Sequence, residues 1–282
     1  MAATACSSLL ALLGIMVFLF SEGLPLFAAY HPEQFFFGMF WYPTSEPPEF
    51  GILPLIIGSS AVTLVAVCIA VPLGVLTAAY LSEIAARSVR RVVKPFVELL
   101  AALPSVVIGF FGMVVVAPFL QETCNLATGL NLFNAGLMLA FMSVPTVCSV
   151  AEDALFAVPR SLREASLALG ATQWETTRKV VLPAALSGIG AAVMLGMSRA
   201  IGETMVVLMA AGGAAMIPGS LFDPARPMPA SIAAEMAEAP FRGQHYHALF
   251  ATGLVLFLFT LCFNLLAHYI SEHYKQTGGS SL

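Results

Sequence analysis

The amino-acid sequence predicts an all-α, polytopic membrane protein with about six transmembrane helices. Hydrophobic residues make up 59% of the 282 residues and charged residues only 10%, whereas soluble domains carry about 25% charged residues. The mean hydropathy is +0.89, and the apolar residues gather in stretches of the roughly 20 residues that cross a bilayer. We therefore expect lipid to surround most of the chain, which should form a single transmembrane domain over residues 1–282.

The first three spans are expected at Leu9–Phe27, Ile52–Leu81 and Phe96–Leu120. The second contains Pro54 and Pro72, which a spanning helix tolerates where neighbouring helices satisfy the freed carbonyl groups. The first stretch could instead be a signal peptide. We interpret it as a retained helix, because no basic region precedes the apolar residues and further spans follow it.

The remaining spans are expected at Leu132–Val150, Ala184–Met209 and His247–Ala267. A long loop over residues 212–246 joins the last two, and within it Ala230–Ala239 resembles a short amphipathic helix. This loop and the segment Tyr30–Phe50 should lie on the same side of the membrane. They could contact a partner on that side or could be simple connectors.

The distribution of basic residues predicts the orientation. Cytoplasmic loops of membrane proteins are enriched in Lys and Arg. Two loops on one side of a six-span arrangement hold most of the cations, namely Arg87, Arg90, Arg91, Lys94, Arg160, Arg163, Arg178 and Lys179. The opposite side has only Arg226 and Arg242. We therefore expect both basic loops and both termini to be cytoplasmic.

Residues 159–183 form a polar segment between two apolar ones, and its pattern predicts a pair of short helices. Ser161 with Glu164, and Thr172 with Glu175, have the spacing of capping boxes. Gly170 stands between them, where a glycine commonly ends a helix. Two short, capped helices at a membrane surface suit the docking of another protein, although a solvated connector is the alternative.

This segment resembles the EAA loop of permeases from ABC importers. The matching residues keep the spacing of that motif, with Ser and Val as mild departures: Glu164-Ala165-Ser166, Gly170, Val180 and Leu182-Pro183. The resemblance implies a type I ABC importer permease. It also implies that Glu164, Ala165, Ser166, Gly170, Leu182 and Pro183 belong to a cytoplasmic coupling loop that seats on a separate ATPase.

Other motifs are similar to those of phosphate-specific (Pst) permeases, in particular the PstC-type subunit. The fullest match is Ser198-Arg199-Ala200-Ile201-Gly202-Glu203-Thr204-Met205. Further matching segments are Phe50–Pro54, Ala70–Gly74, Tyr80–Glu83, Leu103–Val107, Gly109–Gly112 and Ser220–Pro224. The resemblance implies a bacterial inner-membrane protein that pairs with a PstA-like permease. It further implies an ATPase dimer (PstB-like), an extracytoplasmic phosphate-binding protein (PstS-like) and phosphate as substrate.

Arg199 and Glu203 are the charged residues of the fifth expected span, and we predict that they lie on the substrate path. A charge near the centre of a spanning helix is costly and rarely persists without a partner or a role. A spacing of four residues would place both side chains on one helix face. Guanidinium binds phosphate oxygens in a bidentate way, and Glu203 could accept a hydrogen bond from protonated phosphate. The alternative is a structural salt bridge.

Several classes of function are not supported by the sequence. It contains no phosphate-binding loop of the G-x-x-x-x-G-K-[ST] type, so ATP would be used by the partner ATPase and no cofactor is expected on this chain. The five cysteines lack the spacing of a metal site, and there is no basic surface for nucleic acid. We therefore expect a transport subunit, not an enzyme. A permease for another oxyanion or small solute is the nearest alternative.

Overall fold

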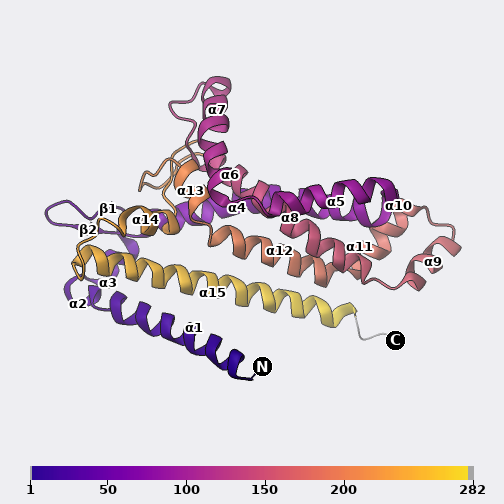
Figure 1. Ribbon diagram of the computed structural model, residues 1–282, viewed down its shortest axis with the longest axis horizontal. Coiled ribbons are helices and arrows are strands. Elements are labelled where there is room, and N and C mark those ends of the chain that lie inside the picture. The colour runs from indigo at the N-terminus through magenta and orange to yellow at the C-terminus, as the bar shows by residue number, and fades with distance from the viewer. Residues whose placement is uncertain (1, 279–282) are drawn as a thin grey trace.

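The computed structural model describes the backbone of residues 2–278, and side chains over most of that range. It is an elongated helical bundle (Figure 1). Five described helical segments are long and apolar enough to cross a membrane, and a sixth qualifies if one sharply bent pair is counted as a span. The protein is therefore all-α apart from a small hairpin, as the sequence predicts.

The first span, α1 (Ala2–Gly23), leads into two short helices, α2 (Leu26–Ala29) and α3 (Pro32–Phe37). Strands β1 (Trp41–Tyr42) and β2 (Glu49–Phe50) follow as an antiparallel hairpin, with Trp41 opposite Phe50. In Figure 1 this hairpin lies at one extreme of the long axis, near α14, while α9 and α10 lie at the other. We call these the hairpin end and the α9 end.

The second span is α4 (Leu53–Ala79), which continues into the π-helix η1 (Tyr80–Ile84). Pro54 occupies its first turn, where a missing N–H costs nothing. Pro72 lies inside the helix, and the close packing of α4 against α8 supports this turn. The segment therefore matches the predicted second span closely.

The third span differs from its prediction. Instead of one helix over Phe96–Leu120, the chain forms α5 (Arg87–Ala101), a break, and then α6 (Ser105–Phe111), η2 (Gly112–Val116) and α7 (Ala117–Cys124). The break falls at Pro104, which has extended backbone angles and caps α6. Proline disfavours a helical conformation in the residue before it, so the apolar run is divided. The spanning part is Ser105–Cys124.

Helix α8 (Leu132–Phe156) is the most buried span, with 61% of its apolar window inside the protein. It begins at Asn131, whose side chain accepts a hydrogen bond from the N–H of Asn134, and it extends six residues beyond the predicted end at Val150. Small residues bring its neighbours close. A Cβ added at Gly136 would lie 2.4 Å from a methyl carbon of Val65 in α4.

The α9 end holds α9 (Arg160–Ala168), α10 (Gln173–Thr176), the π-helix η3 (Thr177–Val181) and α11 (Leu182–Ala184). The chain then bends by 71° into α12 (Leu186–Ile201). The predicted fifth span, Ala184–Met209, is not one helix. Gly202 ends α12, and a separate helix α13 (Met205–Ala210) follows.

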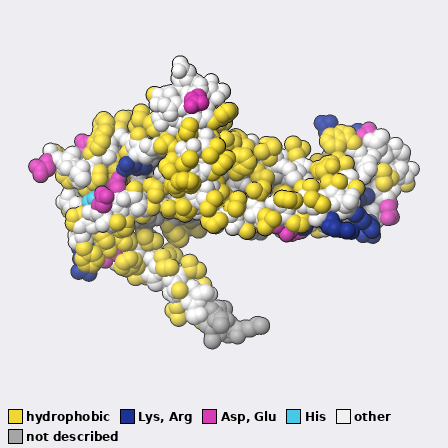
Figure 2. All heavy atoms as spheres, turned by 45° about the horizontal axis from the view of Figure 1, so that its top comes forward, with side chains coloured by type: hydrophobic (Ala, Val, Ile, Leu, Met, Phe, Trp, Pro, Cys, Tyr) yellow, Lys and Arg dark blue, Asp and Glu magenta, His cyan; other side chains and the backbone are white. Residues whose placement is uncertain are grey.

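The expected helix in the long loop is α14 (Met228–Glu235), slightly earlier than Ala230–Ala239. The last span, α15 (Gln244–Gly278), packs against α1. Large hydrophobic side chains are exposed along α1, α5 and α6, including Leu10, Phe96 and Phe110. Figure 2 shows a broad apolar surface over the body of the bundle and Lys and Arg side chains at its α9 end. These faces are suited to lipid or to another membrane subunit.

Candidate functional site

Helix α9 ends in a complete Schellman motif. Gly170 follows its last turn with φ of +86°, a conformation that favours glycine. The N–H of Gly170 donates to the carbonyl of Leu167 over 3.0 Å, and the N–H of Ala171 donates to the carbonyl of Ser166 over 3.3 Å. The sequence-based interpretation of Gly170 as the end of the first short helix is confirmed.

Of the two predicted capping boxes, one forms and the other does not. Thr172 caps α10 by accepting from the N–H of Glu175, whose carboxylate accepts from the N–H of Thr172 over 3.0 Å. Ser161 lies inside α9 and caps nothing, because the helix already starts at Arg160 behind Pro159. Proline fixes its own φ and takes the capping position without a side-chain hydrogen bond.

Arg163 joins α9 to two other elements. Its guanidinium donates to both carboxylate oxygens of Glu83 in η1, over 2.8 and 3.2 Å. The same guanidinium donates to the carbonyl of Leu155 in the last turn of α8, over 2.8 Å, and to the carbonyl of Val158 just after this helix, over 2.6 Å. Gln173 of α10 also donates to the carbonyl of Glu83 over 2.6 Å. Helices α9 and α10 are therefore fastened to the ends of α4 and α8.

The coupling-loop residues predicted from the sequence lie together at the α9 end. Glu164, Ala165 and Ser166 belong to α9, and Leu182 and Pro183 belong to α11. The Ser166 hydroxyl lies 2.9 Å from the hydroxyl of buried Thr176, so this departure from alanine adds a hydrogen bond between α9 and α10. Leu162, Leu167 and Leu169 are exposed on the same helix pair. The result is a rigid platform with apolar side chains on its surface.

Glu152 forms an ion cluster that the sequence analysis missed. Its carboxylate is 2% exposed and lies between Arg90, at 3.0 Å, and Lys94, at 3.1 Å, both on α5. The Arg90 guanidinium also lies 4.0 Å from the centre of the Phe156 ring. The cluster attaches α5 to α8 just before the chain enters α9. A charged residue directly after the predicted fourth span was the available signal.

Arg199 and Glu203 do not form the predicted pair. Glu203 lies beyond the end of α12, so the four-residue spacing no longer places the two side chains on one helix face. Arg199 donates to the hydroxyl of Thr146 in α8 over 3.2 Å, and Glu203 accepts from the N–H of Met205 over 3.2 Å. No ion pair joins the two within the part of the chain that the structure describes. Both side chains are half-buried at the break between α12 and α13.

At the hairpin end, Glu235 of α14 gathers three partners. Its carboxylate accepts from the indole N–H of Trp41 over 2.9 Å, pairs with Arg226 and lies 2.9 Å from His245. These residues come from β1, the long loop and α15. The same loop covers the start of α8, where the N–H groups of Leu132 and Phe133 donate to carbonyls of residues 223 and 221. Both long loops are therefore ordered parts of the bundle.

No cluster of three or more His, Cys, Asp or Glu side chains suited to a metal ion occurs in the described part of the chain. The exposed leucines at the α9 end form an apolar surface that is suited to contact with another protein. At the break after α12, a guanidinium and a carboxylate are held within a membrane bundle.

Comparison with known proteins places these features in one family. Residues 70–276 match the family described as "Binding-protein-dependent transport system inner membrane component". The chain is 39% identical to "Probable ABC transporter permease protein YqgH" of Bacillus subtilis, over 98% of this chain and 90% of that protein. It is 38% identical to "Phosphate transport system permease protein PstC" of Mesorhizobium japonicum, over 82% and 75%.

Solved ABC importers have the same fold. A chain of the inward-facing MetNI methionine transporter superimposes with a TM-score of 0.60 at 22% identity, covering 79% of this chain and 94% of that one. A chain of a bacterial alginate transporter superimposes with a TM-score of 0.65 at 15% identity, covering 99% and 96%.

Proposed function

The chain belongs to the binding-protein-dependent transport system inner membrane component family, and from this premise we propose that it is the permease subunit of an ATP-driven importer of inorganic phosphate. The observation that carries the proposal is the similarity to PstC phosphate permeases over most of the chain, combined with a guanidinium held inside the bundle at Arg199. The protein is a multi-pass membrane protein and catalyses no reaction of its own in this scheme.

The platform formed by α9 and α10 would be cytoplasmic and would seat on the ATPase dimer. Three observations support this role. Gly170 ends α9 and Thr172 caps α10, α9 exposes leucines, and Arg163 connects α9 to η1, which continues α4, and to α8. The basic residues at this end agree with the excess of Lys and Arg in cytoplasmic loops. Both termini would then be cytoplasmic.

Arg199 would hold phosphate briefly on its way through the bundle. A guanidinium is always charged and matches the geometry of phosphate oxygens. Within the described part of the chain, the Arg199 guanidinium donates to the neutral hydroxyl of Thr146 and forms no ion pair, so its charge is available to an anion. Glu203, on the other side of the break at Gly202, would accept a hydrogen bond from a protonated phosphate oxygen. Such a proton is absent from sulfate at neutral pH.

Other subunits would supply the remaining parts of the transporter. A PstA-like permease would complete the pathway, a PstB-like ATPase dimer would supply the energy, and a PstS-like protein would deliver phosphate to the hairpin end. Closure of the ATPase dimer would pull on α9, and the bundle would alternate between its outward-open and inward-open states.

The test is phosphate uptake into vesicles that contain the assembled complex, with Arg199→Gln compared with wild type. We expect uptake to be lost while the ATPase still co-purifies with the permease. The matched control is Arg91→Gln, which removes an exposed cation of α5. Unchanged uptake in Arg199→Gln would contradict the role of Arg199. Uptake of sulfate in preference to phosphate by the wild type would contradict the assigned substrate.

A further inference from the structure

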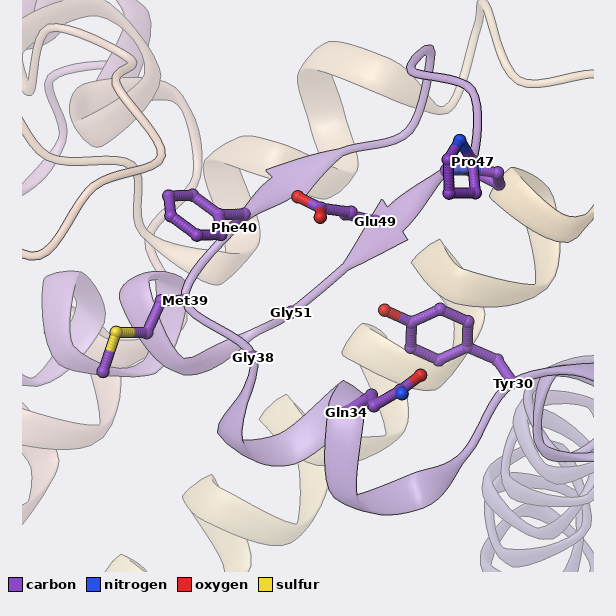
Figure 3. A pocket seen from close by; sticks show the side chains of 9 residues that line it. Tyr30, Gln34, Gly38, Met39, Phe40, Pro47, Glu49 and Gly51 are labelled. Carbon is purple, nitrogen blue, oxygen red and sulfur yellow. The ribbon is translucent and has the colours of Figure 1, made fainter.

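A pocket of about 400 Å³ opens at the hairpin end of the molecule (Figure 3). Tyr30, which follows α2, and Gln34 of α3 form one wall. Phe40, Pro47 and Glu49 of the hairpin form the other. Its volume falls in the range of about 300–1,000 Å³ in which small ligands bind, so it has ample room for one long side chain.

Backbone contacts fix the shape of this pocket. At its base Gly38 and Gly51 cross so closely that a Cβ on Gly51 would lie 2.4 Å from the carbonyl carbon of Gly38. The N–H of Gly51 donates to the carbonyl of Phe40 over 2.8 Å, and the N–H of Phe50 donates to the Tyr30 hydroxyl over 3.3 Å. The two walls are therefore held together through the backbone between them.

The hairpin is also anchored to the rest of the bundle. Trp41 is only 2% exposed, and its indole N–H donates to Glu235 of α14. Phe50, on the opposite strand, is 1% exposed and packs edge-on against Trp41. A pocket that is already formed in the free protein loses little entropy when it is occupied.

The charge of the segment selects the kind of occupant. Residues 30–50 contain Glu33, Glu46 and Glu49 and neither Lys nor Arg. The Glu49 carboxylate lines the pocket, is exposed, and has no ion pair or side-chain hydrogen bond within the described residues. The pocket also contains the aromatic rings of Tyr30 and Phe40, the latter 57% exposed. A carboxylate beside aromatic faces is suited to a cation on a long side chain.

The hairpin offers a contact surface around this pocket. Met39, Phe40 and Tyr42 are each more than half exposed, and the rings of Phe40 and Tyr42 stack with centres 6.1 Å apart. Aromatic residues are enriched in protein–protein interfaces and often contribute most of the binding energy. In Figure 1 the hairpin lies at the end of the long axis opposite α9 and α10, and the proposed function assigns α9 and α10 to the cytoplasmic side.

We propose that this pocket receives a lysine or arginine side chain of the extracytoplasmic binding protein when that protein docks. This inference rests on the proposed function, which supplies the partner, and adds the residues and the charge by which the partner is recognised. The same carboxylates disfavour the approach of free phosphate to the hairpin by like-charge repulsion. A binding protein with basic side chains at its docking face would place a cation in the pocket and would also bring phosphate past the carboxylates that repel the free anion.

The experiment measures the affinity of the assembled complex, in lipid nanodiscs, for the phosphate-loaded binding protein of the same organism. Glu49→Gln should weaken binding about tenfold or more, since it removes one partner of an interfacial charge pair. Glu46→Gln is the matched control, because it removes the same charge from the same hairpin but does not line the pocket. It should change affinity by less than about threefold, as a charge at the rim of an interface does.

A charge exchange makes the test specific. Glu49→Lys should abolish measurable binding, and replacement of one basic residue on the binding protein by Glu should restore it. Equal affinities of wild type and Glu49→Gln would overturn the pocket assignment, as would equal losses in Glu49→Gln and Glu46→Gln. A wild-type complex that does not bind the phosphate-loaded protein at all would overturn the proposed function itself. The two failures are therefore distinguishable.

Discussion

Glu152 lies buried between two cations of α5, and removing both cations should destabilise the bundle far more than neutralising Glu152 itself. In Arg90→Met with Lys94→Met, the carboxylate stays 2% exposed but loses its partners at 3.0 and 3.1 Å. An uncompensated buried charge costs about 3–5 kcal/mol. Both cations are about a third exposed, so solvent weakens the pair and we take the lower end, about 3 kcal/mol.

Glu152→Gln should cost only about 1 kcal/mol, because both cations can then turn toward water or lipid phosphates. Replacing all three residues by Met should leave stability within about 1 kcal/mol of wild type, since a well-packed apolar group of similar size can substitute for a buried ion cluster. We therefore predict the order of the variants in their free energy of unfolding. The double cation variant is the least stable, and the triple variant recovers.

Thermal unfolding of the purified protein in one detergent, at one scan rate, measures this order. A loss of about 3 kcal/mol corresponds to a fall in Tm of roughly 6–12 °C for a protein of this size. Arg87→Met with Arg91→Met is the control, because these two exposed cations lie on the same helix. If the double cation variant unfolded at the wild-type temperature, or if the triple variant were the least stable, the reasoning would be refuted.

Three further predictions concern the α9 end and the long loop. Arg163→Gln removes the connection of α9 to Glu83 and α8. In vesicles, ATP hydrolysis should therefore continue while the amount of phosphate transported per ATP falls several-fold. If phosphate uptake and ATP hydrolysis fell by the same factor, this prediction would be contradicted. Gly170→Val forces a β-branched residue to φ of +86°, at a cost of about 1–2 kcal/mol, and should reduce co-purification of the ATPase; full co-purification would refute the role of the Schellman turn. Asp223 accepts the N–H groups of Ser220 and Gly219, which lowers its pKa below the ordinary 3.8. The stabilisation of this turn should therefore be complete above that value and disappear as pH falls through the lower, folded-state pKa. Asp223→Asn should remove this pH dependence of amide hydrogen exchange at residues 219–220, and an unchanged profile would exclude the carboxylate as its cause.

The transmembrane character, the approximate spans and the paired helices of the polar segment could be predicted from the sequence because they depend on local composition and spacing. Thr172 and Gly170 act through hydrogen bonds to residues within a few positions, so their roles were visible in the sequence. The break before α6 also has a local cause, which is Pro104. The third span was nevertheless predicted as one helix, because the apolar run over Phe96–Leu120 is long enough to cross a membrane.

The features that were missed depend on contacts between distant residues. Glu152 meets Arg90 and Lys94 only because α5 folds back against α8, and no local pattern indicates that meeting. Glu235 likewise gathers Trp41 and Arg226 from separate segments. For Arg199 and Glu203, helical spacing was extrapolated across Gly202, where the helix ends. Gly202, which stands between Arg199 and Glu203 in the sequence, was the available sign that the helix ends there.

Helix α8 is bound at both of its ends, and this has a mechanical consequence. The N–H groups of Leu132 and Phe133 at its start donate to carbonyls of the long loop, and the carbonyl of Leu155 in its last turn accepts from Arg163 of α9. With 25 residues it is a rod of about 37 Å, so a tilt of about 10° about one end displaces the other by roughly 6 Å. Helix α8 therefore connects α9 directly to the loop that covers its first turn. We expect a movement of α9 to displace that loop directly, through the one helix that both contact.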